Sequence, residues 1–393
     1  MAEIPVPIGA IYKGGDSASL NALRANEEAS KVYAPSVFSP HTLSEKGHKR
    51  VAQTRVPKGK NKRPTDDAIS KGATLPSQEA GFDVYYEVHG KGPKKIICLM
   101  GLNNSCFGWL QQVERFGSDP DYSILVIDNR GYGNSETPAG FYTTSSMAKD
   151  ALEVMDQIGW TADRQLHVVG VSMGGMITLE IAKLAPKRVA SINLVSTTSG
   201  QGRGEKNLLT SLPPLTGVTT IARVIAGRIL NLDSDQWRVG QVLELLFPKV
   251  WLAEVHPEDP SGRTRRDVMR EMFEWRFAYT RKQTLPGAFA QIGAVATHRV
   301  TPKELAAINL DIPAIAIFTG DQDNLVNPAN SFHLHKHLPR ADFTQYKNGG
   351  HALPVQKPQE LNDALQKNFE KAAAHLANSV SGPWPHFTSV SKQ

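Results

Sequence analysis

The sequence predicts an α/β fold in which a mostly parallel sheet is flanked by helices and interrupted by one helical insertion. Short apolar runs alternate with helical patterns from about residue 81, and short connections join them. This alternation is typical of parallel strands linked by crossover helices. It stops at Ser199, and from there to about His298 the pattern is helical but irregular, so this stretch is interpreted as an insertion; the strand pattern returns at Ile312. A hydrophobic content of 40% and a charged content of 21% fit a globular protein.

The strands are predicted from their apolar patterns. The stretch FDVYYEVHG alternates and is rich in residues that favour strands, whereas KKIICLM and YSILVIDN are continuous apolar runs, typical of strands covered on both faces. Strands are expected at residues 82–90, 94–100, 122–129, 165–171, 189–197, 312–320 and 342–350.

The helices are predicted from apolar residues at helical spacing. Met147, Ala151, Met155 and Ile158 fall on one stripe, and serines before them are suited to cap the helix. Helices are expected at residues 145–159, 173–185 and 357–377.

These elements divide the chain into four parts. We expect a basic, flexible N-terminal extension at residues 1–76, with a short helix at 19–32. The α/β core is expected at residues 77–200 and 300–380, the mostly helical insert at 201–299, and a tail at 381–393.

The net charge of +6 is unevenly distributed, because Lys and Arg are concentrated in residues 48–63. That segment has almost no large apolar residue, which favours a solvated arm, with weak contact to anionic surfaces as the alternative. Aromatic residues do not interleave its charges as in single-stranded nucleic-acid sites, so no nucleic-acid partner is expected. The oligomeric state stays open.

The cysteines and apolar runs indicate a cellular setting. Cys98 and Cys106 are the only cysteines, so a disulfide framework is excluded and an intracellular, cytoplasmic location is expected. No apolar run approaches 18 residues, so no transmembrane segment is expected. No His/Cys cluster has zinc-ligand spacing and no glycine-rich nucleotide loop follows a first strand, so neither metal nor cofactor is expected.

A serine between glycines marks a candidate reactive site. Gly170-Val171-Ser172-Met173-Gly174 lies where an apolar strand ends and a helical pattern begins. So tight a turn needs small flanking residues, and it lifts the serine hydroxyl clear of the sheet. The motif alone is weak evidence, but its strand-to-helix setting strengthens it.

A serine nucleophile needs a base, and the base needs an orienting acid. Asp321 and Asp323 follow one late strand, and His351 follows the next, after two glycines. The order Ser, Asp, His is the one expected of a serine elbow in this architecture. The other histidines considered are not expected to be catalytic. His298 is expected to be structural, and His333, His335 and His337 are expected on the surface of a helix.

Several motifs together resemble the α/β-hydrolase fold family over residues 80–375. LMGLNNSCFGW resembles its oxyanion loop, DNRGYGNS its Asp-x-Arg-Gly-x-Gly-x-Ser signature, and GVSMGG its nucleophile elbow. GDQD resembles the acid turn and GGH the histidine loop. The resemblance implies a serine hydrolase with a helical cap between strands 6 and 7, closest to the esterase and enol-lactonase branch.

The resemblance also implies roles for five residues. Ser172 is the expected nucleophile, His351 the general base and acid, and Asp323, three residues after Gly320, the orienting acid. Backbone N–H groups of Leu102 and Met173 are the expected oxyanion hole. The chain has Met100-Gly101 where the family usually has His-Gly, which puts the anchoring of this loop in question.

The expected function is cleavage of a carboxylic ester, lactone or thioester bond in a small, partly apolar substrate. Serine at the elbow argues against the epoxide hydrolases and haloalkane dehalogenases of this fold, which place aspartate there. An acyltransferase or a carbon–carbon bond hydrolase with the same triad is the nearest alternative. A ligand receptor or scaffold with little turnover is the alternative of a different class.

Overall fold

The computed structural model describes residue 38 and residues 42–52, 81–200, 214–230, 234–280 and 283–380. Eight strands of this part form one sheet in the order β1-β2-β4-β3-β5-β6-β7-β8. Their bounds are β1 Leu43–Ala52, β2 Gly81–His89, β3 Lys94–Leu99, β4 Tyr122–Ile127, β5 Leu166–Val171, β6 Val189–Val195, β7 Ala314–Gly320 and β8 Asp342–Tyr346. β2 is antiparallel to both of its neighbours, β1 and β4, and every other neighbouring pair is parallel, so the predicted mostly parallel sheet is confirmed.

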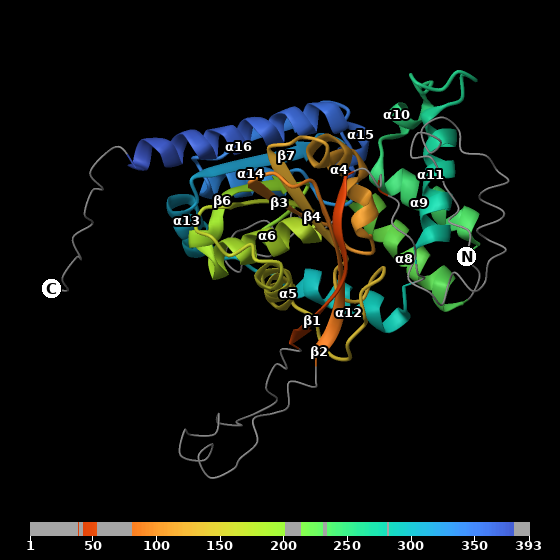
Figure 1. The fold of residues 1–393 in the computed structure, drawn as a ribbon. Helices are drawn as coiled ribbons and strands as arrows, with labels where there is room; N and C mark the ends of the chain where they lie inside the picture. Colours follow the sequence, from red (N-terminus) through yellow and green to blue (C-terminus); the bar gives the residue numbers. More distant parts are fainter. Residues whose placement is uncertain are drawn as a thin grey trace, which may run out of the picture.

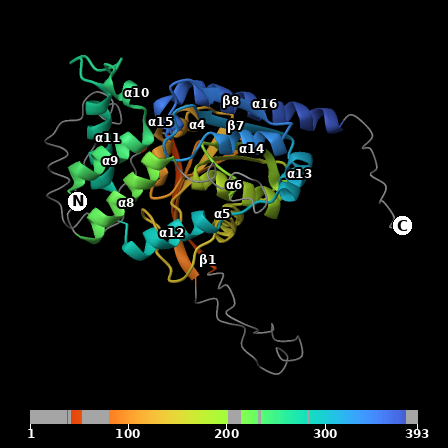
Figure 2. The same ribbon diagram turned by 180° about the vertical axis from the view of Figure 1, so that it is seen from behind.

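Helices cover both faces of this sheet, as predicted (Figures 1 and 2). In the core they are α4 Leu110–Gly117, α5 Thr144–Gln157, α6 Met173–Leu184, α13 Pro302–Asp311, α14 Ala329–His337, α15 Leu353–Gln356 and α16 Pro358–Val380, with short 3-10 helices η3 Cys106–Trp109 and η4 Pro186–Arg188. Between β6 and β7 the chain forms α8 Leu215–Ile229, α9 Asp235–Leu246, α10 Lys249–Ala253, α11 Arg265–Tyr279 and α12 Leu285–Thr297, here called the inserted helices.

The strands contribute side chains to two apolar clusters, because successive side chains point to opposite faces of a sheet. Ile96 and Cys98 of β3 join the cluster that contains α4 and α16. Ile97 and Leu99 of the same strand join the cluster that contains α5, α6 and α13. Continuous apolar runs such as KKIICL are therefore buried on both faces, as the sequence predicts.

The N-terminal boundary differs from the expectation. Residues 43–52, assigned to the flexible extension, form β1, which pairs antiparallel with β2 along its length. Val51 is fully buried, and His48 Nε2 lies 3.1 Å from the carbonyl oxygen of Asn134. The charged residues of this segment mask the alternation of a strand, although an edge strand carries charge readily. The expected helix at residues 19–32, the rest of the basic segment and the tail at 381–393 lie outside the described residues.

The inserted helices lie at one end of the sheet (Figures 1 and 2). Residues of α9 and α11 pack into the same apolar cluster as β3 and β5. An isolated bridge between Gly200 and Arg299 joins the start and the end of the insertion. The insertion therefore leaves and re-enters the core at one place.

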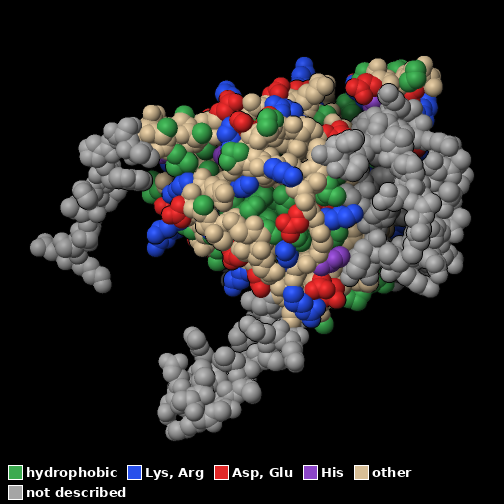
Figure 3. All heavy atoms as spheres, viewed as in Figure 1, with side chains coloured by type: hydrophobic (Ala, Val, Ile, Leu, Met, Phe, Trp, Pro, Cys, Tyr) green, Lys and Arg blue, Asp and Glu red, His purple; other side chains and the backbone are tan. Residues whose placement is uncertain are grey.

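The described surface carries both signs of charge. In Figure 3, Lys and Arg are interspersed with Asp and Glu on the face shown. No helix among the described residues is both long and apolar enough to cross a membrane.

Candidate active site

Ser172 occupies a strained turn between β5 and α6. Its backbone has φ 56° and ψ −120°, which a non-glycine residue rarely adopts. A Cβ at Gly170 would lie 2.2 Å from the carbonyl oxygen of Gly174, and one at Gly174 would lie 1.9 Å from that of Leu99. The glycines around the serine are therefore a packing requirement, as the motif predicts.

His351 and Asp323 come together from the ends of two neighbouring strands. Asp323 follows β7, and His351 follows β8. The ring nitrogen Nδ1 of His351 lies 2.8 Å from Oδ2 and 3.1 Å from Oδ1 of Asp323. Both residues are buried, so this contact is protected from water.

The turn after β7 distinguishes its two aspartates. Asp323 Oδ1 also accepts the backbone N–H groups of Leu325 and Val326, each at 2.8 Å. Asp321 is exposed, and its Oδ1 accepts the N–H of Gly349 at 3.1 Å. Asp323 is therefore the carboxylate that faces His351, whereas Asp321 stabilises the turn.

The loop at residues 100–105, here called the β3 loop, is anchored to the core at both ends. Asn129 Nδ2 donates to the carbonyl oxygen of Met100 at 2.9 Å. The N–H of Cys106, just after the loop, donates to Asp128 Oδ1 at 2.7 Å. These bonds hold the loop although Met100 stands where the resemblance leads one to expect a histidine.

Asp128 begins the DNRGYGNS motif and is buried. Burial raises the pKa of its carboxyl group to about 6, while the N–H groups of Cys106 and Asn134, which donate to it, act in the opposite direction. A Cβ at Gly133, which has φ 60°, would lie 2.2 Å from Asp128 Oδ2. The motif thus builds a tight turn that holds one end of the β3 loop.

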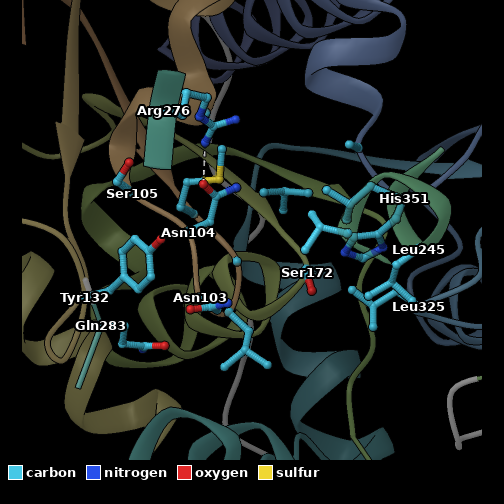
Figure 4. Close-up of a pocket in the computed structure, with 18 of the residues that line it drawn as sticks. Asn103, Asn104, Ser105, Tyr132, Ser172, Leu245, Arg276, Gln283, Leu325 and His351 are labelled. Carbon is cyan, nitrogen blue, oxygen red and sulfur yellow. Dashed lines mark hydrogen bonds between the residues drawn. The ribbon is translucent and has the colours of Figure 1, made fainter. Parts of the chain in front are cut away.

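Ser172 and His351 line one cavity of about 200 Å³ together with Gly101, Leu102 and the inserted helices. Figure 4 shows both side chains in this pocket. Its walls are mainly apolar, with contributions from Val224, Val242, Leu246, Phe273, Phe289 and Ile292. Met173, the first residue of α6, has a backbone N–H that helix geometry leaves without an intrahelical acceptor.

Two side chains of the inserted helices reach the β3 loop, and no local sequence pattern indicates either contact. The guanidinium of Arg276 donates to Asn104 Oδ1 (Figure 4). Gln291 Oε1 accepts the backbone N–H of Asn103 at 3.1 Å. Each contact joins residues more than 170 positions apart, and only a structure or co-varying homologues would reveal it.

The remaining histidines of interest take no part in this site. His298 is buried, its Nδ1 lies 2.8 Å from Thr144 Oγ1, and burial lowers its pKa to about 3. His333 and His337 lie on α14 with their rings 4.6 Å apart. Within the described part of the chain, no group of three or more His, Cys, Asp or Glu residues is arranged to hold a metal ion.

Comparison with known proteins places this geometry in context. Residues 94–358 match the family model described as "alpha/beta hydrolase fold". A protein of Caulobacter segnis named "Putative carbamate hydrolase RutD" is 26% identical over 295 residues, which cover 74% of this chain and 97% of that protein.

Two solved structures share the fold at low sequence identity. A thermophilic esterase from Thermogutta terrifontis has a TM-score of 0.58 and 18% identity, covering 76% of this chain and 96% of that one. An enol-lactonase from Burkholderia xenovorans LB400 has a TM-score of 0.57 and 19% identity, covering 74% of this chain and 97% of that one. At this identity the likeness concerns the fold alone.

Proposed function

Because the chain belongs to the α/β-hydrolase fold family, we propose that it is a serine hydrolase acting on a small, partly apolar substrate. The bond cleaved is a carboxylic ester, lactone or thioester. Ser172 is the nucleophile, His351 the general base and acid, and Asp323 the residue that orients His351. The observation that carries the proposal is a strained serine in the same cavity as a histidine bonded to a buried aspartate.

The reaction proceeds in two halves. Ser172 Oγ attacks the carbonyl carbon while its proton passes to His351 Nε2. The tetrahedral intermediate collapses, the bond to the leaving group breaks, and His351 gives the proton to the leaving group. Water then attacks the acyl-enzyme with His351 again acting as base, which releases the acid and restores the Ser172 hydroxyl.

Asp323 keeps His351 in the productive tautomer. An Nδ1–H donated to the carboxylate leaves Nε2 as the proton acceptor, and the negative charge stabilises the imidazolium that forms. The N–H groups of Leu325 and Val326 fix the carboxylate in place. Backbone N–H groups of Leu102 and Met173 are proposed to stabilise the oxyanion, since a donor of this kind contributes roughly 3–4 kcal/mol of barrier lowering.

The pocket supports a substrate with apolar groups. Apolar side chains of α9, α11 and α12 form much of its wall, and a burial gain of about 25 cal/mol per Å² favours an apolar acyl or alcohol part. An activated carbamate belongs in the substrate panel as well, because it reacts by the same acyl chemistry and the Caulobacter relative carries that name.

The test is Ser172→Ala measured beside the wild-type chain. We expect turnover of nitrophenyl esters to fall by at least about 10³-fold, because the nucleophile is lost. Labelling by a fluorophosphonate probe should disappear while circular dichroism and the melting temperature stay close to the wild type. Equal turnover in the purified variant, or a wild-type chain that neither labels nor turns over any ester, would contradict the proposal.

A further inference from the structure

We propose that Gln291 of α12 is a positioning residue that sets the β3 loop for oxyanion binding. The inference rests on the proposed function, since it concerns the loop that supplies the Leu102 N–H. Gln291 is fully buried and does not line the pocket. It therefore acts through the loop rather than on the substrate.

The carboxamide of Gln291 is fixed by bonds at both of its polar atoms. Its Oε1 accepts the N–H of Asn103 at 3.1 Å and the side-chain amide of Gln283 at 3.2 Å. Its Nε2 donates to the carbonyl oxygen of Arg130 at 2.8 Å. One side chain of the inserted helices thus joins the loops that follow β3 and β4.

The bond to Asn103 acts at a strained point of the chain. Asn103 has φ 55°, in the left-handed region that asparagine tolerates better than most residues. Its N–H belongs to the peptide directly after Leu102, whose own N–H is the proposed oxyanion donor. Gln291 is buried and fixed, whereas Asn103 is exposed, so loss of this acceptor frees the Asn103 N–H from its fixed partner and lets the peptide after Leu102 turn.

A second contact of the same kind supports the inference. Arg276 of α11 donates to the side chain of the next residue, Asn104. The core holds the two ends of the loop through Asn129 and Asp128, whereas the inserted helices hold its middle. The loop geometry therefore depends on α11 and α12 being seated on the core, which couples pocket assembly to catalysis.

The experiment compares three substitutions of Gln291 in the full chain. Gln291→Met conserves volume and removes every hydrogen bond, and Gln291→Asn withdraws the carboxamide by one methylene. Gln291→Glu keeps an oxygen to accept the Asn103 N–H, and because burial favours the protonated carboxyl, its O–H can still donate to the carbonyl oxygen of Arg130. We expect kcat to fall roughly tenfold or more in the Met and Asn variants, below the 10²–10³ of deleting a donor outright.

Two readouts separate positioning from folding. KM should change by less than about threefold, because Gln291 does not line the pocket and the apolar side chains that do are unchanged, whereas the Ki of a trifluoromethyl ketone should rise as kcat/KM falls. That ketone forms a tetrahedral adduct, and such analogues report stabilisation of the transition state. The Glu variant should retain kcat within about threefold of the wild type.

Asn368→Leu is the matched control. Its side-chain amide also donates to a buried backbone carbonyl, that of Ile192, at 3.2 Å, but it joins α16 to β6 away from the pocket. We expect it to lower the melting temperature and leave kcat unchanged. If the Met variant does not fold, the kcat of the Asn variant tests the proposal.

The proposal is overturned if folded Met or Asn variants keep kcat within twofold of the wild type. It is also overturned if the Glu variant loses as much as the Met variant. Failure of the proposed function has a different signature, because the wild-type chain would then show no Ser172-dependent turnover to compare.

Discussion

At the scale of single residues, Asp321 and Asp323 follow the same strand but have different partners. Asp323 is buried against His351, and its Oδ1 also accepts hydrogen bonds from two backbone N–H groups. Asp321 is exposed; its side chain accepts the N–H of Gly349 across the turn, and its own backbone N–H donates to the carbonyl oxygen of Tyr346. A difference of two positions thus separates a proposed catalytic role from a local structural one.

We expect Asp323→Asn to lower kcat/KM by roughly 10³–10⁴-fold on nitrophenyl esters. The amide cannot stabilise the imidazolium, and its NH2 group favours the wrong tautomer of His351. Asp321→Asn is the matched control and should change the rate by less than about fivefold, because its remaining Oδ1 still accepts the Gly349 N–H. Steady-state kinetics on folded protein make the comparison, and an exchange of the two effects would assign the acid to Asp321.

The residues of the candidate triad could be predicted because each lies in a short local pattern. The turn at Ser172 needs glycines, and the acid and base follow strand ends that the apolar runs mark. Gln291 and Arg276 could not be predicted in this way. Their partners in the β3 loop are distant in the sequence, and a glutamine or arginine within a helix looks the same whether or not it meets a loop.

At the scale of elements, the β5–α6 turn depends on close approach of backbones. Gly174 lies in the first turn of α6 against the end of β3, where a Cβ would meet the carbonyl oxygen of Leu99 at 1.9 Å. A Cβ at Gly174 could be accommodated only if the strand or the helix moved. The helix start, the serine and the β3 loop are therefore set by one packing contact.

Gly174→Ala should lower both stability and activity. Overpacking of this kind typically costs about 1–3 kcal/mol, and a shift of α6 would also move Ser172 and the Met173 N–H. Gly293→Ala is the control, since Gly293 lies in α12 with open space around its Cβ position. It should be neutral or stabilise by about 0.5–1 kcal/mol. Urea unfolding and ester turnover test both; an active, fully stable Gly174→Ala protein would contradict the packing argument.

The strand β1 shows where element prediction from sequence is weakest. Its sequence LSEKGHKRVA carries charge on an edge strand that is covered only in part, so hydrophobic alternation is a poor guide there. The central strands β3, β4 and β5 are buried on both faces, and their apolar runs made them predictable. A buried strand is therefore easier to predict from its sequence than a partly exposed edge strand.

At the scale of the whole molecule, β1 closes one edge of the sheet against the rest of the core. It pairs with β2, and Gln157 at the end of α5 donates to the carbonyl oxygen of Arg50 at 2.9 Å. Just before it, Thr42 Oγ1 lies 2.9 Å from His89 Nδ1, and Phe38 packs edge-on against Phe107. The segment that the sequence assigned to a dispensable extension thus contributes to both the sheet and its core.

We expect a chain of residues 54–393 to be less stable than a chain of residues 37–393. Both lack the first 36 residues, so whatever those contribute cancels in the comparison. The shorter chain loses the buried side chains of Phe38 and Val51, worth about 1.5–3 kcal/mol each. It also leaves β2 as an unpaired edge, which favours aggregation. Its melting temperature should fall by several degrees, and its soluble yield should drop.

The kcat of the soluble fraction should stay within about threefold of that of the longer chain. The reason is that β1 lies at the opposite edge of the sheet from β7 and β8. Equal stability of the two chains by differential scanning calorimetry would show that β1 adds nothing to the fold, and the extension would then end where the sequence placed it.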